Sequence, residues 1–180
     1  MNHDPFDDVR AATRRHRAEH GCGAYLYGEG ALLGVVTATA RARRIVEVGT
    51  ALGYSALWLA HGAPAAVLDT IEADGEHVRL AREHIAQHGA AERLRVHHGR
   101  AEEILPALAP DAYDVAFFDG FAPTVPVILA LRRLLRAGGV LIAGNLTIGS
   151  GAAVLGDLLD ASRWLTHSLG ETALAVKRGP

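Results

Sequence analysis

One short stretch of this sequence decides its fold: Arg44-Ile45-Val46-Glu47-Val48-Gly49-Thr50-Ala51-Leu52-Gly53-Tyr54-Ser55. A β-branched run comes first, a turn with two glycines follows, and Ser55 opens a helix-like run. A buried strand, a tight turn and a helix N-terminus in this order form the nucleotide-binding unit of parallel α/β sheets. Glycine adopts backbone angles closed to other residues and lets a ligand approach the chain. We therefore predict a site for a nucleotide-like cofactor at this turn.

Strand and helix signals alternate along the chain, which predicts a single doubly wound, mostly parallel seven-stranded sheet of the α/β class, with helices at the N-terminus. The length suits one domain, in which 1–29 forms a helical cap and 30–180 the cofactor-binding core. The predicted strands are 45–48, 66–71, 94–97, 115–118, 140–143, 164–168 and 172–176. The predicted helices are 6–20, 30–40, 55–61, 76–88, 102–108, 125–136 and 157–162, with a turn at 137–139 and a loop at 149–153.

The composition excludes several classes of protein. A net charge of −2 gives no general attraction to nucleic acid or anionic membranes. Cys22 is the single cysteine, which excludes an internal disulfide and a cysteine-based zinc cluster. No apolar run approaches the roughly 20 residues that span a bilayer, and the start of the chain is polar and acidic, unlike a signal peptide. We expect a cytoplasmic protein.

The spacing of the turn narrows the cofactor. Gly49-x-x-x-Gly53 departs from the Gly-x-Gly-x-x-Gly pattern of dinucleotide sites and lacks the Gly-Lys-Ser/Thr end of a phosphate loop, which favours a nucleoside without phosphates. Glu72 closes the second predicted strand, where a carboxylate accepts hydrogen bonds from two ribose hydroxyls. The alternative for Glu72 is a solvated carboxylate at a strand end. Asp74 is expected to cap the next helix.

The stretch from Glu47 to Ser55 resembles motif I of class I S-adenosylmethionine-dependent methyltransferases, and in particular the catechol and caffeoyl-CoA O-methyltransferase branch with its Glu-x-Gly-x-x-x-Gly-Tyr-Ser pattern. Several later segments are similar to further motifs of that family: Thr70-Ile71-Glu72, Gly99 to Pro106, Asp114 to Asp119, Leu134 to Val140 and Leu169 to Val176. The resemblance implies a Rossmann-like fold and S-adenosylmethionine as the cofactor.

The resemblance also implies roles for individual residues. Glu47 and Gly49 would border the methionine part of the cofactor, with Ser55 near its carboxylate. Glu72 would hold the ribose. The adenine would meet the backbone N–H of Ala101 and the side chain of Glu102. The full set of implied cofactor residues is Glu47, Gly49, Gly53, Tyr54, Ser55, Glu72, Ala101, Glu102 and Asp119, and Tyr25 or Tyr27 would cover the amino-acid end, unless these tyrosines belong to the core.

The metal site of the branch is incomplete in this sequence. Its ligands are an Asp after the fourth strand and an Asp-Asn pair after the fifth; here Asp119 and Asn145 are present, but Gly144 replaces the second Asp and Ala122 a frequent Lys. Because Mg²⁺ prefers six oxygen ligands, often with one or two carboxylates, we expect Asp119 and Asn145 to hold a divalent cation weakly, if at all. They are also the candidate catalytic residues. Alternatively, Asp119 accepts a hydrogen bond from substrate or cofactor, and Asn145 caps a turn.

Methyl transfer to a hydroxyl often needs a base, and a histidine is suited to that role near neutral pH. The sequence has ten histidines and does not choose among them. We considered His98 beside the adenine segment, His16 and His20 on the first helix, and His3, with a plain surface position as the alternative for each. The base is therefore left open.

We therefore expect an S-adenosylmethionine-dependent enzyme that O-methylates a small hydroxylated, aromatic acceptor. The segment 147–152 is shorter than in the family, which predicts an open acceptor site or one completed by the N-terminal helix or a second subunit. A homodimer is implied by the resemblance, with 30–40 or the last strands at the interface. Two alternatives stay open: an RNA nucleoside methyltransferase that uses the arginines of 10–17, and a non-catalytic cofactor-binding partner protein.

Overall fold

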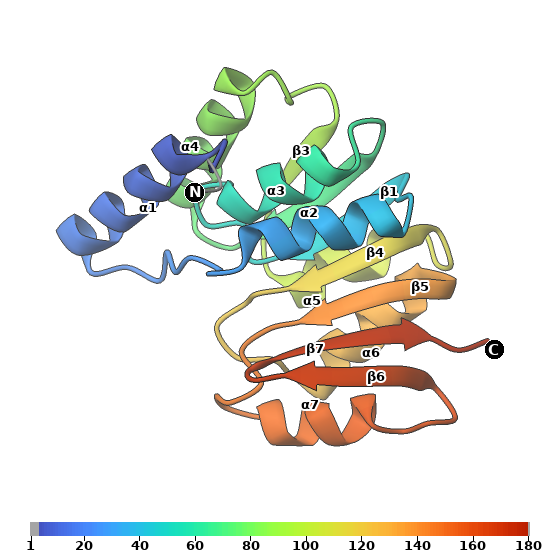
Figure 1. Ribbon diagram of the computed structural model, residues 1–180. Coiled ribbons are helices and arrows are strands. Elements are labelled where there is room, and N and C mark those ends of the chain that lie inside the picture. Colours follow the sequence, from blue (N-terminus) through green and yellow to red (C-terminus); the bar gives the residue numbers. More distant parts are fainter. Residues whose placement is uncertain (1–3, 180) are drawn as a thin grey trace.

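The computed structural model describes residues 4–179, so His3 lies outside the described residues. Its centre is a seven-stranded sheet in the order β3-β2-β1-β4-β5-β7-β6 (Figure 1). The strands are β1 (Arg44–Val48), β2 (Val67–Glu72), β3 (Leu94–His98), β4 (Tyr113–Phe118), β5 (Leu135–Ala143), β6 (Trp164–Leu169) and β7 (Thr172–Lys177). β1 to β5 are parallel, while β7 runs antiparallel to both β5 and β6. The prediction of a mostly parallel seven-stranded sheet is confirmed.

Helices cover both faces of this sheet (Figure 1). They are α1 (Asp7–His20), α2 (Gly30–Thr39), α3 (Tyr54–Gly62), α4 (Gly75–Gln87), α5 (Ala101–Ile104), the short 3₁₀ helix η1 (Leu105–Ala107), α6 (Val125–Leu134) and α7 (Gly151–Leu158). Successive strand residues point to opposite faces, so Ile45 packs with α1 to α4 and Val46 packs with α6 and α7. No helix within 4–179 is long and apolar enough to cross a membrane.

The predictions for two local segments were wrong, and glycine is the reason in both. The predicted loop at 149–153 and helix at 157–162 are replaced by α7. Gly151 is buried there, and a Cβ on it would lie 2.1 Å from the carbonyl oxygen of Leu146, so this glycine permits close packing rather than a loop. The turn predicted at 137–139 lies inside β5, where Gly138 has a φ of 76° and the pairing with β4 shifts register.

One carboxyl group of the core, that of Glu47, is completely buried. Glu47 lies in β1 with no exposed surface. Its Oε2 accepts a hydrogen bond of 2.5 Å from the Thr70 hydroxyl, and Oε1 has no hydrogen-bond partner among the described residues. Burial raises the pKa of Glu47 to about 7, and the nearby Glu72 adds to this, while the Ser55 and Thr70 hydroxyls oppose it. The protonation of Glu47 is therefore coupled to the folding of the protein.

This pKa shift predicts how stability depends on pH. Between the ordinary value of 4.5 and about 7, the folded protein binds the Glu47 proton more tightly than the unfolded chain does. The free energy of unfolding should therefore fall as pH rises through this window. Glu47→Gln should reduce the slope, by an amount on the order of 1 kcal/mol for each pKa unit. Urea unfolding of the cofactor-free protein from pH 5 to 8 measures it.

The control for this measurement is Glu92→Gln, because Glu92 is exposed and should keep the wild-type slope. Equal slopes for the wild type and Glu47→Gln would contradict the assignment of a raised pKa to this carboxyl group.

Candidate active site

A cavity of about 1020 Å³ opens at the carboxyl ends of β1, β2 and β4. Its size suits a small organic ligand, since such pockets span roughly 300–1,000 Å³. The walls come from the segment before α2, the turn after β1, the ends of β2 and β4, and the turn between β6 and β7. The strand order reverses at β1, between β2 and β4, and ligands of open α/β sheets bind at such a point.

Gly49 brings the ends of β1 and β4 together at the floor of this cavity. It has a φ of 95°, and a Cβ on it would lie 2.8 Å from the backbone carbonyl of Asp119. The N–H of Asp119 donates to the carbonyl of Val48 at 2.9 Å, and the N–H of Gly49 donates to that of Ile71 at 3.0 Å. Only glycine fits here, because any side chain would separate β1 from β4.

Glu72 organises the glycine turn and faces the same cavity. Its Oε2 accepts the N–H of Ala51 at 2.8 Å, and its Oε1 accepts the N–H of Asp74 at 2.9 Å. Ala51 has a φ of 45°, which an L-residue adopts only when the surroundings hold it there. Each carboxylate oxygen has a second lone pair. Two further hydrogen bonds, such as those of a ribose diol, therefore fit this side chain.

Asp119 follows β4 and lines the cavity beside Asn145. The Asn145 amide nitrogen donates to the Gly120 carbonyl at 2.8 Å and to Asp119 Oδ1 at 3.3 Å. Burial raises the pKa of Asp119 to about 8, with further contributions from Glu47 and Glu171, and the Asn145 hydrogen bond opposes the shift. A carboxyl group with such a pKa can exchange a proton with a ligand near neutral pH.

The arrangement does not fit a tightly held divalent cation at this position. The Gly120 carbonyl only accepts hydrogen bonds, so the Asn145 atom facing it is the nitrogen, and the same nitrogen faces Asp119. A metal would require an oxygen there. Gly144 supplies no ligand, although a Cβ on it would lie 3.2 Å from Asp119 Oδ1. The side chain of the second Asp of the family's metal site, which Gly144 replaces, would therefore begin next to Asp119.

Most of the remaining residues predicted from the sequence line the cavity, and the others lie beneath it or away from it. The wall includes Tyr25, Tyr27, Tyr54, Ser55 and Ala101. Glu47 is buried outside the lining, and Gly53 serves as the left-handed N-cap of α3 with a φ of 98°. Glu102 is exposed and lies 3.7 Å from Arg100. Within 4–179, no histidine lines the cavity, so His16, His20 and His98 all lie outside it.

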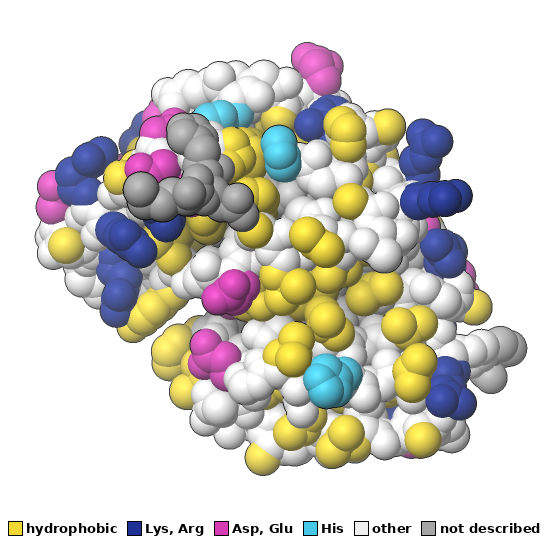
Figure 2. Space-filling model, in the orientation of Figure 1, with side chains coloured by type: hydrophobic (Ala, Val, Ile, Leu, Met, Phe, Trp, Pro, Cys, Tyr) yellow, Lys and Arg dark blue, Asp and Glu magenta, His cyan; other side chains and the backbone are white. Residues whose placement is uncertain are grey.

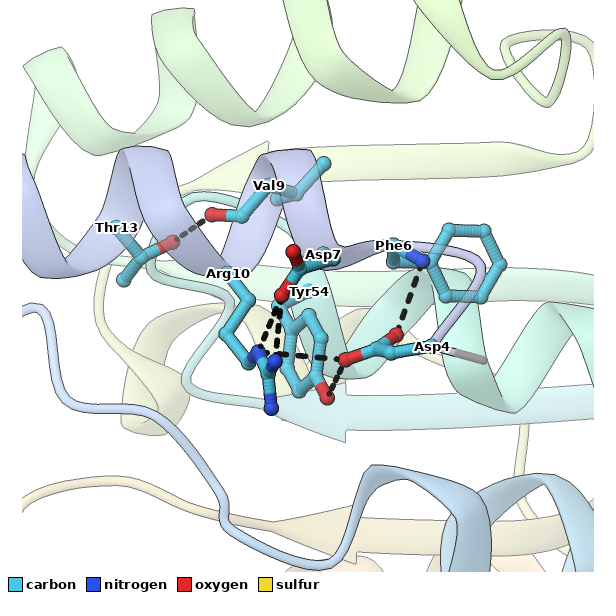
Figure 3. A network of polar contacts seen from close by, with 7 residues as sticks. All are labelled: Asp4, Phe6, Asp7, Val9, Arg10, Thr13 and Tyr54. Carbon is cyan, nitrogen blue, oxygen red and sulfur yellow. Dashed lines mark hydrogen bonds and ion pairs between the residues drawn. The ribbon is translucent and has the colours of Figure 1, made fainter. Parts of the chain in front are cut away.

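Tyr54 connects the glycine turn to the N-terminal segment (Figure 3). Its hydroxyl donates to Asp4 Oδ2 at 2.8 Å. Arg10 lies 3.4 Å from the same carboxylate and also pairs with Asp7 at 2.5 Å. This network holds the start of α1 against α3, which places the segment after α1 at the edge of the cavity. Tyr54 therefore contributes to the cavity wall and to the docking of α1.

Of the residues that form the apolar rim of the cavity, sequence reasoning gave a role to Tyr25 but none to Phe121, Ile148 or Leu169. Phe121 is 79% exposed and Tyr25 is 55% exposed, and both line the cavity together with Ile148 and Leu169. Phe121 follows Asp119 by two residues, so its position after β4 was a usable signal. Leu169 ends β6, and only the antiparallel hairpin brings it to this rim. No local pattern could have shown that.

Comparison with known proteins agrees with this geometry. A family model described as a methyltransferase domain matches residues 46–146. A relative from Mycobacterium sp. (strain JLS), whose provisional name is O-methyltransferase, is 38% identical over 149 residues, which cover 81% of this chain and 68% of the relative.

Two solved structures have the same fold. A protein of Klebsiella pneumoniae with the same provisional name is 25% identical, with a TM-score of 0.85 over 99% of this chain and 92% of that one. The O-methyltransferase TomG of Streptomyces achromogenes, solved in complex with S-adenosylmethionine and involved in tomaymycin synthesis, is 26% identical, with a TM-score of 0.81 over 96% and 91%. The chain therefore belongs to the S-adenosylmethionine-dependent O-methyltransferase family.

Proposed function

We propose that this enzyme methylates a hydroxyl group of a small aromatic acceptor. The observation that carries the proposal is the rim of the cavity, where Phe121, Tyr25, Ile148 and Leu169 expose apolar surface beside Asp119. Exposed aromatic and aliphatic groups around a polar centre are typical of sites for small ring-shaped ligands. The screen that tests it offers labelled S-adenosylmethionine with pools of phenols, aliphatic alcohols and RNA. Label in RNA or in aliphatic alcohols alone would contradict the proposal.

The cofactor position in this proposal follows the polar groups of the cavity. Bound S-adenosylmethionine supplies an electrophilic methyl group on a positively charged sulfur. Glu72 accepts hydrogen bonds from the ribose, Ala101 borders the adenine, and Gly49 and Ser55 border the amino-acid part. Glu47, beneath the turn, supports its backbone through Thr70, whose hydroxyl contacts that of Thr50 at 2.5 Å. Glu102 is left outside the site because it does not line the cavity.

Glu72→Ala should weaken S-adenosylmethionine binding by roughly 10- to 100-fold, since it removes charge-assisted hydrogen bonds worth about 1.5–3 kcal/mol. Calorimetry with the cofactor measures the change. Glu102→Ala is the matched control, because the Glu102 carboxylate is exposed. This variant should bind S-adenosylmethionine with the affinity of the wild type. A thermal unfolding curve checks that both variants are folded. Unchanged affinity in Glu72→Ala would remove this residue from the site.

Asp119 is the proposed base. The reaction is a displacement in which the acceptor oxygen bonds to the methyl carbon as the carbon–sulfur bond breaks, and the hydroxyl proton must leave. Asp119 lies beside the apolar rim and is held by Asn145. Its ionised form accepts that proton, and Asn145 keeps the carboxylate oriented. No metal ion is needed for this step.

The raised pKa of Asp119 predicts the pH dependence of the rate. Because a base acts in its ionised form, kcat/KM should rise with pH and level off above about 8. Asp119→Asn should lower kcat/KM on the order of 10²-fold or more and remove that rise. Initial rates from pH 6 to 9, with and without added Mg²⁺, test this. A rate that depends on Mg²⁺, or an unchanged profile in Asp119→Asn, would contradict the proposal.

The two alternatives from the sequence are less well supported. Two of the four arginines of α1 are engaged locally: Arg10 pairs with Asp4 and Asp7, and the Arg17 guanidinium lies 3.8 Å from the centre of the Tyr25 ring. These contacts therefore reduce the basic surface that α1 could offer to RNA. A non-catalytic partner protein would bind the cofactor without transferring label to any pool, so the same screen distinguishes it.

We also propose a homodimer. One face of β5, β7 and β6 has no helix over it, and apolar side chains gather there (Figures 1 and 2). Val140, Val176 and Leu165 are paired across these strands, and Leu165 is 61% exposed. Cross-strand neighbours share a face, so they form one apolar strip.

We also propose that the chain is a single domain in which the segment before α2 caps the cavity. We further propose a cytoplasmic location, in which the free Cys22 stays reduced.

Leu165→Glu should convert the dimer to monomers, because it places a charge in the apolar strip. Leu159→Glu is the control: Leu159 is equally exposed, at 60%, but lies at the end of α7 on the opposite face of the sheet. Sedimentation equilibrium of both variants and the wild type gives the masses. A wild-type monomer at micromolar concentration would overturn the dimer, and a dimeric Leu165→Glu would overturn this interface.

A further inference from the structure

Three side chains with metal-binding atoms meet outside the cofactor cavity. They are His16 on α1, Cys22 in the turn after α1, and His77 in the first turn of α4. One ligand atom of each lies within 4.8 Å of the other two. None of the three lines the cavity described above, so the proposed methyl transfer does not use them.

The local structure brings these groups together. α1 ends at His20, and Gly21 follows in the left-handed conformation with a φ of 61°, donating its N–H to the carbonyl of Arg17. This cap reverses the chain and returns Cys22 towards His16. On the other side, Asp74 caps α4 by accepting the backbone N–H of His77 at 3.0 Å. The position of each ligand is therefore fixed by a helix end.

The two imidazoles already contact one another. The rings of His16 and His77 meet edge to face with their centres 5.3 Å apart, and His77 is buried. Burial lowers the pKa of His16, and the neighbouring His20 and His77 lower it further. The neutral imidazole is the form that donates a lone pair to a metal. The environment therefore favours the ligating form.

Two imidazole nitrogens and one thiolate are a ligand set for zinc rather than for magnesium or calcium, which prefer oxygen. Bond lengths of about 2.0–2.3 Å place neighbouring ligands of tetrahedral zinc roughly 3.5 Å apart. The ligand atoms lie up to 4.8 Å apart, so their separations need to shrink by up to about 1.3 Å to reach that geometry, which small rotations of the half-buried Cys22 and of the two imidazoles allow. Three protein ligands leave the fourth position for water.

We propose that His16, Cys22 and His77 bind one zinc ion that joins α1 to α4. Thr13 and Gly23, which flank His16 and Cys22 in the sequence, line the cofactor cavity. Glu72 Oε1 lies 3.9 Å from Nδ1 of His77. The ion therefore fixes the N-terminal cap beside the cavity, next to the carboxylate that holds the ribose in the proposed function. The zinc site itself does not depend on that function.

The test uses Co²⁺ and Zn²⁺ as probes on the untagged full-length chain after removal of metal. The wild type should bind one equivalent of Co²⁺ with a thiolate-to-cobalt charge-transfer band, and Zn²⁺ should displace it. Cys22→Ser should lose the band, and His77→Gln should bind Zn²⁺ at least tenfold more weakly. His167→Gln, which removes an exposed histidine of β6, should behave as the wild type.

A second readout does not rely on cobalt. One equivalent of Zn²⁺ should raise the Tm of the wild type and of His167→Gln, but not that of Cys22→Ser, because a ligand stabilises only the state that binds it. No charge-transfer band in the wild type would overturn the proposal. So would Zn²⁺ binding of equal affinity in Cys22→Ser, since this would show an adventitious ion on surface histidines only.

Discussion

The close approach of β1 and β4 at Gly49 is the constraint on which the active site depends. A Cβ at this position would lie 2.8 Å from the backbone of Asp119. The absence of a side chain lets the two strands end side by side, and it sets Asp119 at the floor of the cavity. Glu72 reaches the same turn from β2 through the N–H of Ala51. The glycine turn therefore meets two carboxylate-bearing residues from different strands, Asp119 after β4 and Glu72 on β2.

The carboxylates around the cavity are costly in the absence of a ligand. The pKa of Glu47 is raised to about 7 and that of Asp119 to about 8, and burial is the main cause of both. A ligand with a positive charge offsets this cost, and the sulfonium of S-adenosylmethionine has one. The same acidic surroundings give Asp119 a pKa that suits a base without a metal. In the proposed mechanism, the affinity for the cofactor and the strength of Asp119 as a base therefore have the same electrostatic origin.

Sequence patterns predicted regular elements well and glycine-dependent packing poorly. The alternation of strands and helices followed from local periodicity, which the structure confirms. Gly151 and Gly138 were interpreted as loop and turn signals, but one allows α7 to pack against Leu146 and the other lies inside β5. A glycine that relieves a tertiary contact has the same local signature as one that ends an element. The pattern alone cannot separate them.

The sequence by itself determined the fold class and the cofactor and predicted Glu72 as the ribose-binding carboxylate, because the strand, the glycine turn and Glu72 are local features with fixed spacing. Only the tertiary structure decided the rest. The Asn145 amide turns its nitrogen towards Asp119, Leu169 reaches the cavity rim through an antiparallel hairpin, and His16 meets His77 across two helices. These contacts join residues far apart in the chain, and their geometry depends on how whole elements pack.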